Sequence, residues 1–366
     1  DTRKSVKLSC DHPGGNLTKV VIEGDEVRLE QDLRDTTAWW FYWNFCIEGA
    51  AGRRVTFRFT NGEVLGPYGP AVSFDGRRWD FAGAETLQAR SAFSYRFSRG
   101  EGKAYFAFCA PYTLRDWETW LEGMRGAPLT PGVLTHTEQN RPVPLLRLGR
   151  REEGKAVLLT ARHHACEASA SWLLEGLCEQ LLRHEAGFLE KHPVHVVPFV
   201  DLDGVEAGDQ GKARAPHDHN RDYTGYPRYA SVQALTGYTQ RLKPAIALDL
   251  HSPYRWGGRN DHPFVVLGPS PWKEEMDRFG DALARLGSRA SADSIRYVRG
   301  MDIAFGDEWN QDTPTTAASF FRRAGARLAF TFEVPYFNAG PPATPERLRE
   351  FGALFARALV AYARGT

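Results

Sequence analysis

Two histidines and a glutamate lie close together in the segment His163-His164-Ala165-Cys166-Glu167. The segment follows a predicted strand and precedes a predicted helix, and α/β folds commonly place ligand groups at such turns. His164 and Glu167 are three residues apart, so a single turn can direct both side chains to one point. Two histidines and one glutamate can hold a catalytic zinc ion and leave one position for water. The HxxE spacing alone is a weak signal, because it also arises by chance.

Two further polar side chains stand where predicted buried strands end. Asp249-Leu250-His251 closes one strand, and His251 is either a third metal ligand or a capped core histidine. Glu333 closes another, and a carboxylate beside a metal can act as a general base. A salt-bridged strand-end glutamate is the plainer alternative. Because strand ends on one edge of a sheet converge, these residues belong together with the HxxE segment.

A fourth polar segment runs from Arg214 to Asp222 and crowds arginine, asparagine, histidine and aspartate. Arginine binds a carboxylate through two parallel hydrogen bonds and can stabilise an oxyanion. The segment therefore suits an anionic substrate end, although a solvated polar loop is an equal alternative. His217 and His219 are rival metal ligands, since they are alternate residues in the same segment.

The composition excludes several classes of protein. The 366 residues include 46 Lys and Arg against 45 Asp and Glu, a net charge of +1, so the basic excess of a nucleic-acid binder is absent. No apolar run approaches the roughly 18 residues that a membrane span needs. Hydrophobic residues make up 42% and charged residues 25%, which argues against disorder. The length allows about two domains.

The amino-terminal part reads as short strands. Residues 54–59, 92–97 and 104–108 alternate polar and apolar side chains, and 39–45 is dense in aromatic residues. Period-two alternation between turns is typical of antiparallel strands with one buried face. We therefore predict a small antiparallel β-sandwich over residues 1–110, with its aromatic side chains packed in the core.

From residue 111 onwards, predicted strands alternate with helices. A helix is expected over 113–124, and the closing helix over 345–364 has Thr344 as its candidate N-cap. We predict an α/β/α layer fold with a mixed sheet over residues 111–366. Its remaining predicted elements are strands 143–148, 156–160, 194–200, 245–250 and 328–332 and a helix over 168–183.

The cysteines and the first residue bear on the compartment. The five cysteines are scattered, odd in number and without a CxxC pair, so no disulfide framework is expected. The chain begins with Asp1, and the stretch Asp1–Val6 looks like a leader remnant. An exported location is therefore favoured over a cytoplasmic one.

Taken together, these motifs resemble the zinc carboxypeptidases, and among them the cytosolic-carboxypeptidase branch with an amino-terminal β-sandwich. In the amino-terminal half the resemblance rests on Trp40-Phe41-Tyr42-Trp43-Asn44-Phe45 and on the run from Ala104 to Thr113. In the second half it rests on the HxxE, on the turn Asp203-Gly204-Val205, and on the sequences Asn220-Arg221, Asp249-Leu250-His251 and Phe330-Thr331-Phe332-Glu333.

The resemblance implies a metal site and a general base. His164, Glu167 and His251 match the ligands of one Zn²⁺ ion per chain. His163 is the less favoured histidine of its pair, because the family spacing is HxxE. Glu333 matches the glutamate that activates the zinc-bound water.

The resemblance also assigns the polar segment. Asn220 and Arg221 match the pair that grips the terminal α-carboxylate of the substrate, and Arg214 matches the arginine that polarises the scissile carbonyl. Asp218 matches a carboxylate that orients a ligand histidine. The segment 307–321 is expected to shape the pocket for the last side chain, and Arg322 and Arg323 lie nearby in sequence.

The expected function is a zinc-dependent metallocarboxypeptidase that removes C-terminal residues from peptides or proteins. The alternative on the same scaffold is a zinc amidohydrolase, such as an N-acyl-amino-acid deacylase or a murein-peptide amidase. A silent binding module is a third reading. No nucleic-acid partner and no membrane span is expected, and the sequence does not determine the oligomeric state.

Overall fold

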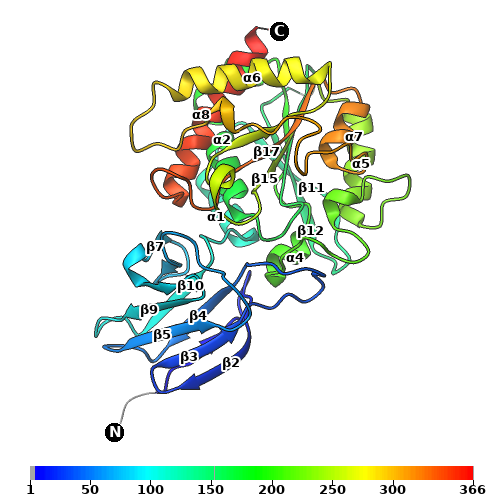
Figure 1. Ribbon diagram of the computed structural model, residues 1–366. Helices are drawn as coiled ribbons and strands as arrows, with labels where there is room; N and C mark the ends of the chain where they lie inside the picture. Colours follow the sequence, from blue (N-terminus) through cyan, green and yellow to red (C-terminus); the bar gives the residue numbers. More distant parts are fainter. Residues whose placement is uncertain (1–4, 152, 366) are drawn as a thin grey trace.

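A computed structural model describes residues 5–151 and 153–365 of the chain, and it shows an amino-terminal pair of sheets beneath a larger α/β region (Figure 1). The first four residues of the stretch Asp1–Val6, interpreted above as a leader remnant, lie outside the described part. The predicted division at residue 110 falls between the last strand of the sheets and the first helix.

The amino-terminal sheets form a sandwich, which we call the sandwich from here on (residues 7–107). Phe45 and Phe57 pack across the gap between the sheets with ring centroids 5.4 Å apart, and Phe93 meets Phe106 at 5.3 Å. The pairing is antiparallel except between β3 and β5, which run parallel. One sheet has the order β1(Lys7–Ser9), β4(Asn44–Glu48), β10(Lys103–Ala107), β6(Ala71–Ser73), β7(Asp80–Phe81), and the other β2(Thr18–Glu23), β3(Glu26–Glu30), β5(Arg54–Phe59), β9(Ala92–Arg96), β8(Leu87–Ala89).

The aromatic run at residues 39–45 differs from the expected strand, because only its last two residues belong to β4. Residues before them bond elsewhere: the backbone of Tyr42 pairs with the side chain of Gln210, which lies in the α/β region. The backbone carbonyl of Trp40 accepts a hydrogen bond from Gln31. These side-chain partners replace a neighbouring strand, so the run crosses from the sandwich to the α/β region as extended chain.

The α/β region is built on a seven-stranded mixed sheet, as predicted. Its four central strands, β14, β13, β15 and β17, run parallel, while β11, β12 and β16 pair antiparallel at the edges. The order is β11(Leu129–His136), β12(Pro142–Leu148), β14(Val194–Val197), β13(Val157–Ala161), β15(Ile246–His251), β17(Leu328–Glu333), β16(Phe264–Val266). Buried parallel strands explain the continuous apolar runs of the sequence.

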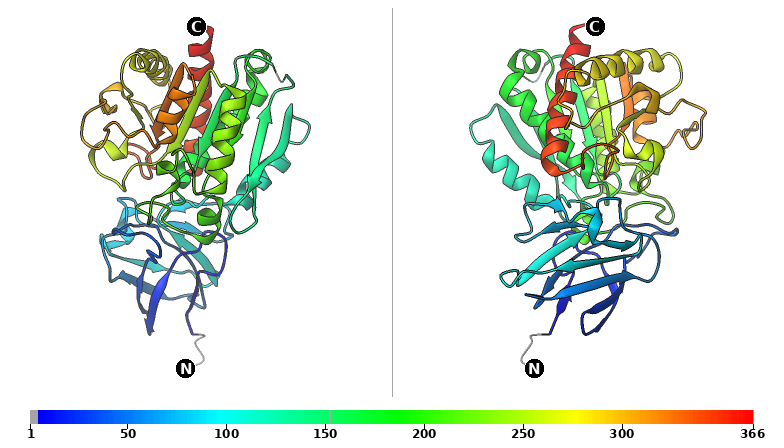
Figure 2. Two further views of the ribbon diagram at one scale, coloured as in Figure 1. Left: turned by 90° about the vertical axis from the view of Figure 1, so that its right-hand side faces the viewer. Right: turned by 60° about the vertical axis from the view of Figure 1, so that its left-hand side comes forward.

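Helices cover both faces of this sheet (Figure 2). α2, α6 and α8 share one apolar core with Leu159 and Leu248, whereas α5 and α7 share a second with Leu158 and Ala247. The side chain of Thr344 caps α8 as predicted, whereas Thr113, expected inside the first helix, precedes α1 and forms a capping box with Asp116. The helices are α1(Leu114–Gly123), α2(Ala168–His184), α3(Ala186–Leu189), α4(Leu202–Ala207), α5(Ala230–Leu242), α6(Trp272–Gly287), α7(Ala317–Arg323) and α8(Pro345–Arg364), with short 3-10 turns at Ala84–Thr86, His219–Arg221, Gly258–Asp261 and Arg299–Met301.

The sandwich sits against the carboxyl edge of the parallel strands. Asn16 donates to the carbonyl of Gly208, and Gln210 both accepts from and donates to the backbone of Tyr42. Gly208 and Gln210 belong to the loop that follows α4, so the sandwich holds a loop that leads into the predicted site.

Within the described residues, every helix is too short or too polar to span a bilayer. All five cysteines are unpaired.

Candidate metal centre and substrate cavity

Three predicted ligands meet at the carboxyl ends of neighbouring strands. The Nδ1 atoms of His164 and His251 lie 3.1 Å apart, and the two Glu167 oxygens lie 2.9 Å and 2.8 Å from them. The HxxE segment follows β13, and His251 is the last residue of β15. All three side chains are buried. Strands β13 and β15 pair in parallel, so their ends bring the three groups together.

Two aspartates hold the far sides of the histidine rings. Asp249 Oδ2 accepts from His251 Nε2 at 2.7 Å, and Asp218 Oδ1 lies 3.5 Å from His164 Nε2. Both contacts turn the Nδ1 atoms toward Glu167, the arrangement in which an outer carboxylate orients a metal-binding imidazole. Burial opposes both charges, but His164 and His163 respectively hold the pKa of Asp218 and of Asp249 well below the usual range.

A second group of donor atoms lies behind the first. His163, Asp249 and His251 come close enough to share an ion. However, His163 is fully buried between Asp249 and the hydroxyl of Tyr223, at 2.8 Å and 2.6 Å. It does not line the cavity, so this group leaves no position for a substrate. The structure thus separates the paired histidines, because His164 lines the cavity and His163 does not.

Glu333 ends β17 directly beside His251, because the two residues are partners in the strand register. Its side chain lines the cavity and is only 6% exposed. One of its oxygens, Oε2, is buried without a hydrogen-bond partner among the described residues. Burial raises the pKa of Glu333 to about 7, with the nearby carboxylate of Glu167 acting in the same direction. A carboxyl group with such a pKa can both accept and return a proton near neutral pH.

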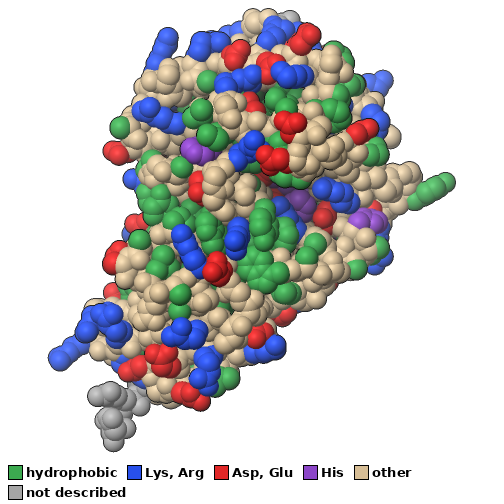
Figure 3. Space-filling view, in the orientation of Figure 1, with side chains coloured by type: hydrophobic (Ala, Val, Ile, Leu, Met, Phe, Trp, Pro, Cys, Tyr) green, Lys and Arg blue, Asp and Glu red, His purple; other side chains and the backbone are tan. Residues whose placement is uncertain are grey.

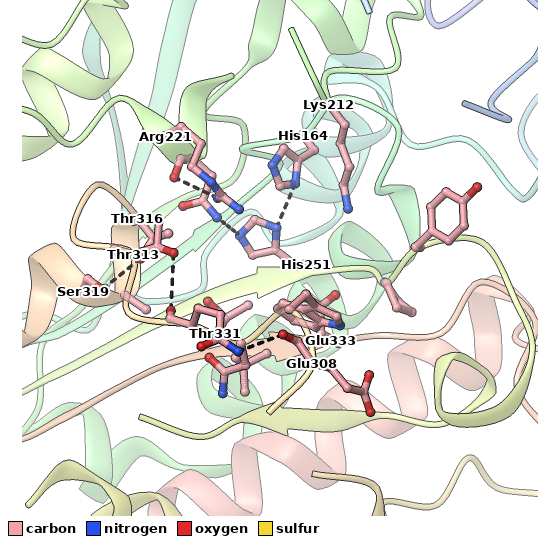
Figure 4. A pocket seen from close by; sticks show the side chains of 18 of the residues that line it. His164, Lys212, Arg221, His251, Glu308, Thr313, Thr316, Ser319, Thr331 and Glu333 are labelled. Atoms are coloured by element: carbon pink, nitrogen blue, oxygen red, sulfur yellow. Dashed lines mark hydrogen bonds between the residues drawn. The ribbon is translucent and has the colours of Figure 1, made fainter. Parts of the chain in front are cut away.

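The cavity in front of these groups has a volume of about 690 Å³ (Figure 4). In the space-filling view a histidine is visible in a recess bordered by hydrophobic and basic side chains (Figure 3). Trp40 of the sandwich contributes to the wall, and so does Tyr254. The segment predicted to shape the pocket does line it, through Glu308, Trp309, Asn310, Gln311, Thr313, Thr316, Ala318 and Ser319.

The polar segment divides between two sides of its loop. Asp218, Asn220 and Arg221 line the cavity. Arg214 does not: it forms ion pairs with Asp35, Asp201 at 2.8 Å and Asp209 at 3.0 Å, and it lines a separate hollow. The structure therefore does not bring Arg214 to the place that the resemblance assigned to it.

Of the predicted carboxylate-binding pair, Asn220 and Arg221, the arginine is available for a substrate carboxylate. Arg221 donates to the backbone carbonyl of Asn220, and no carboxylate of the described chain lies within ion-pair distance of it. Asn220 accepts from the backbone of Ala317, which fixes the start of α7 beside the cavity. Its amide nitrogen is 3.5 Å from His251.

The rival histidines face away. His217 pairs with Asp222 at 2.7 Å, and His219 stacks on Tyr229 with centroids 3.7 Å apart. Neither lines the cavity. Both therefore serve the packing of their loop.

Arg322 lies on the cavity wall, at the end of α7, and donates to Ser319 Oγ at 2.9 Å and to the carbonyl of Ala329 at 3.4 Å. Among the residues covered by the structure, none offers it a carboxylate at ion-pair distance. Burial, together with the adjacent Arg323, lowers the pKa of Arg322 to about 10, so the guanidinium stays charged at neutral pH. It is a second free cation in the cavity.

The residues present fit a zinc ion. Two imidazoles and one carboxylate, all buried and turned to one point, are a donor set that zinc accepts. The outer aspartates supply the second layer of contacts that such sites use. The open cavity in front leaves room for water and substrate.

Lys212 and Trp40 are among the cavity residues that sequence reasoning missed. Lys212 stands two positions before Arg214 in the same polar segment, and that proximity was the available signal. Trp40 lies in the aromatic run that was interpreted as sandwich core. No sequence pattern distinguishes a core tryptophan from one that crosses to another sheet.

Comparisons with known proteins agree with this geometry. Residues 128–239 match the family model "Zinc carboxypeptidase". The chain is 30% identical over 146 residues to Cytosolic carboxypeptidase 3 of Bos taurus, a match covering 36% of this chain and 15% of the relative. The chain thus spans only a small part of that relative. An uncharacterized protein of Zymomonas mobilis is 24% identical over 91% of this chain and 88% of its own length.

A solved structure has the same fold. The metallo-carboxypeptidase from Burkholderia cenocepacia superposes with a TM-score of 0.81 at 21% identity, over 99% of this chain and 100% of the other. The likeness extends over the sandwich and the α/β region together.

Proposed function

Because the chain carries a zinc carboxypeptidase domain, we propose that it is a zinc-dependent metallocarboxypeptidase that hydrolyses the C-terminal peptide bond of peptides or proteins. One observation carries the proposal. His164 and His251 open onto the same cavity as Glu333 and the guanidinium of Arg221, and the buried Glu167 contacts both imidazoles. A hydrolytic centre and a carboxylate anchor in one cavity are what an enzyme specific for chain ends requires.

Arg221 sets the position of the substrate. A guanidinium forms two parallel hydrogen bonds with a carboxylate, and the α-carboxylate at a chain end supplies one. Asn220 stands beside it as a further polar group. A peptide bond in the middle of a chain has no such carboxylate, so this contact favours cleavage at the end.

Hydrolysis requires a nucleophile, a base and an acid. When bound, zinc makes water nucleophilic near neutral pH and polarises the carbonyl group. Glu333 takes one proton of the attacking water on a carboxylate oxygen. It then delivers that proton to the amide nitrogen as the C–N bond breaks. The products are the shortened peptide with a new carboxylate and a free amino acid.

Arg322 supports a preference for an acidic last residue. Its guanidinium lies on the cavity wall without a carboxylate partner from residues 5–151 or 153–365, and a glutamate or aspartate side chain of the substrate would supply one. Thr313 and Thr316 also line the cavity, but their hydroxyls donate to the backbone carbonyls of Gln311 and Thr313, which leaves Arg322 as the donor for an acidic side chain. We therefore propose that the enzyme favours acidic over neutral C-terminal residues.

A zinc amidohydrolase remains the alternative, because a deacylase or a murein-peptide amidase can use the same ligands and base. The free Arg221 favours the carboxypeptidase, since an amide substrate without a terminal carboxylate leaves that charge unpaired.

The test is amino-acid release from a peptide library with free C-termini, run beside an amidated copy, with zinc-loaded and chelated protein. We expect metal-dependent release from the free C-termini alone. Glu333→Gln should keep zinc and lose turnover, because glutamine cannot accept the proton. Release from neither set would refute the carboxypeptidase, and a Glu333→Gln variant that changes nothing would point to a binding module.

A further inference from the structure

Lys212 lines the cavity, although no assigned role includes it (Figure 4). Its ammonium is 2.7 Å from Glu167 Oε1 and 3.4 Å from the carbonyl oxygen of Ser252. The side chain is only 15% exposed. An ammonium has three N–H donors, and these two acceptors use two of them. One donor is left for a group in the cavity.

The acidic neighbours of this lysine belong to the predicted reaction centre. Its ammonium contacts the carboxylate of Glu167, and Glu333 lines the same cavity. Those two residues are the predicted zinc ligand and the predicted base. Lys212 therefore places a cationic side chain beside the groups where the reaction would occur.

Arg214 cannot supply that charge without a large rearrangement. Its guanidinium is shared among three carboxylates, and burial and these partners leave it facing a different hollow from the cavity. Turning it into the cavity would leave Asp201 buried without its counter-ion, which is strongly unfavourable. The loop therefore presents Lys212 on one side and Arg214 on the other.

The sandwich fixes the side of the loop that carries Lys212. The ammonium lies 5.3 Å from the ring centroid of Trp40, within the range of a cation–π contact. Thr37 donates its backbone N–H and its hydroxyl to the carbonyl of Ala213, the next residue after Lys212. Tyr42 pairs with Gln210, two residues before it. One extended segment of the sandwich thus holds the loop before, at and after the lysine.

We propose that Lys212 is a catalytic residue that donates a hydrogen bond to the scissile carbonyl oxygen, and that Trp40 is the positioning residue for its ammonium. When water attacks the carbonyl carbon, the π electrons of the C=O bond move to that oxygen, and the third N–H of Lys212 meets the developing negative charge. This electron pair re-forms the C=O bond as the C–N bond breaks and its electrons leave with the amine. The lysine donates a hydrogen bond throughout and neither gains nor loses a proton. The inference rests on the proposed carboxypeptidase function and assigns to Lys212 the task that the resemblance gave to Arg214.

The test compares Lys212→Met and Lys212→Arg with the wild-type holoenzyme. Losing one oxyanion donor typically costs about 10²- to 10³-fold in kcat, so we expect that loss for Lys212→Met and partial recovery for Lys212→Arg. Lys273→Met, on the exposed face of α6, is the matched control and should retain full activity.

A binding measurement separates this role from support of the metal. Calorimetry would compare a tetrahedral phosphonate analogue of the peptide with a product carboxylate, and zinc content would be measured on the same samples. Weaker phosphonate binding by Lys212→Met, with product binding and zinc retained, is the expected result. Unchanged phosphonate binding, or loss of zinc along with activity, would overturn the inference. Wild-type protein that releases no amino acid would instead refute the proposed function.

Variants of Trp40 test its positioning role separately from the role of Lys212. Trp40→Phe keeps an aromatic face and should rescue most of the kcat that Trp40→Leu loses, with KM changing less than kcat. Equal activity of wild type and Trp40→Leu would remove the positioning role.

Discussion

Replacing Arg322 tests whether one cation decides the preferred last residue. Arg322→Met keeps the length of the side chain but removes the guanidinium. A hydrogen bond to a charged group is worth about 1.5–3 kcal/mol, and Arg322 has no competing carboxylate among the described residues. Converted at about 1.4 kcal/mol per tenfold, the ratio of kcat/KM for peptides ending in Glu over those ending in Gln should fall about 10- to 150-fold.

The assay is initial-rate release of the last residue from a matched pair of peptides that differ only in Glu against Gln. Arg323→Met is the control, because Arg323 is the next residue of α7, carries the same charge and is exposed outside the cavity. The Glu/Gln ratio should be unchanged in this control. A ratio that is the same in wild type and Arg322→Met would refute the reasoning, as would an equal fall in the control, which would indicate a long-range charge effect.

Two further predictions concern stability. In Gly352→Ala the new Cβ would lie 2.1 Å from the carbonyl oxygen of Leu173, because α8 and α2 meet backbone to backbone there. The free energy of unfolding, measured with urea, should therefore fall by about 1–3 kcal/mol or more. Gly187→Ala has open space around it and should leave that free energy nearly unchanged. Burial lowers the pKa of His195 to about 4, with Arg147 acting in the same direction. Between about pH 6.5 and pH 4 the unfolded chain therefore binds a proton at this histidine that the folded chain does not bind. The free energy of unfolding falls as the pH drops through this window. His195→Gln removes that titration, so its unfolding free energy relative to wild type should improve from pH 7 to pH 5; a constant difference would contradict the assignment.

The local patterns of the sequence predicted the central parallel strands of the mixed sheet and the helices α1, α2 and α8. Strand β5 and helix α8 have the predicted bounds, and α2 differs by one residue at its end. Alternation and apolar runs report burial directly, and caps such as Thr344 act on the three residues that follow them. These signals are local, so a single sequence contains them.

The convergence of the candidate ligands was also readable. The HxxE segment, His251 and Glu333 all lie at strand ends. The carboxyl ends of parallel strands share one edge of the sheet. What local spacing could not show is which atoms face inward. Asp249 and Asp218 fix the orientation of the rings, because Asp249 contacts Nε2 of His251 and Asp218 lies near Nε2 of His164. The Nδ1 atoms are then left to face Glu167.

The sequence by itself determined the element types, the strand ends and the residues able to bind a metal, since each depends on neighbours within a few positions. Only the tertiary structure decided which of Lys212 and Arg214 lines the cavity. Asp35, Asp201 and Asp209 reach Arg214 from distant segments and hold it outside, while Trp40 crosses from the sandwich to meet Lys212. Ion pairs and ring contacts between segments far apart in sequence select one side of a loop, and two basic residues that stand two positions apart carry no local sign of that selection.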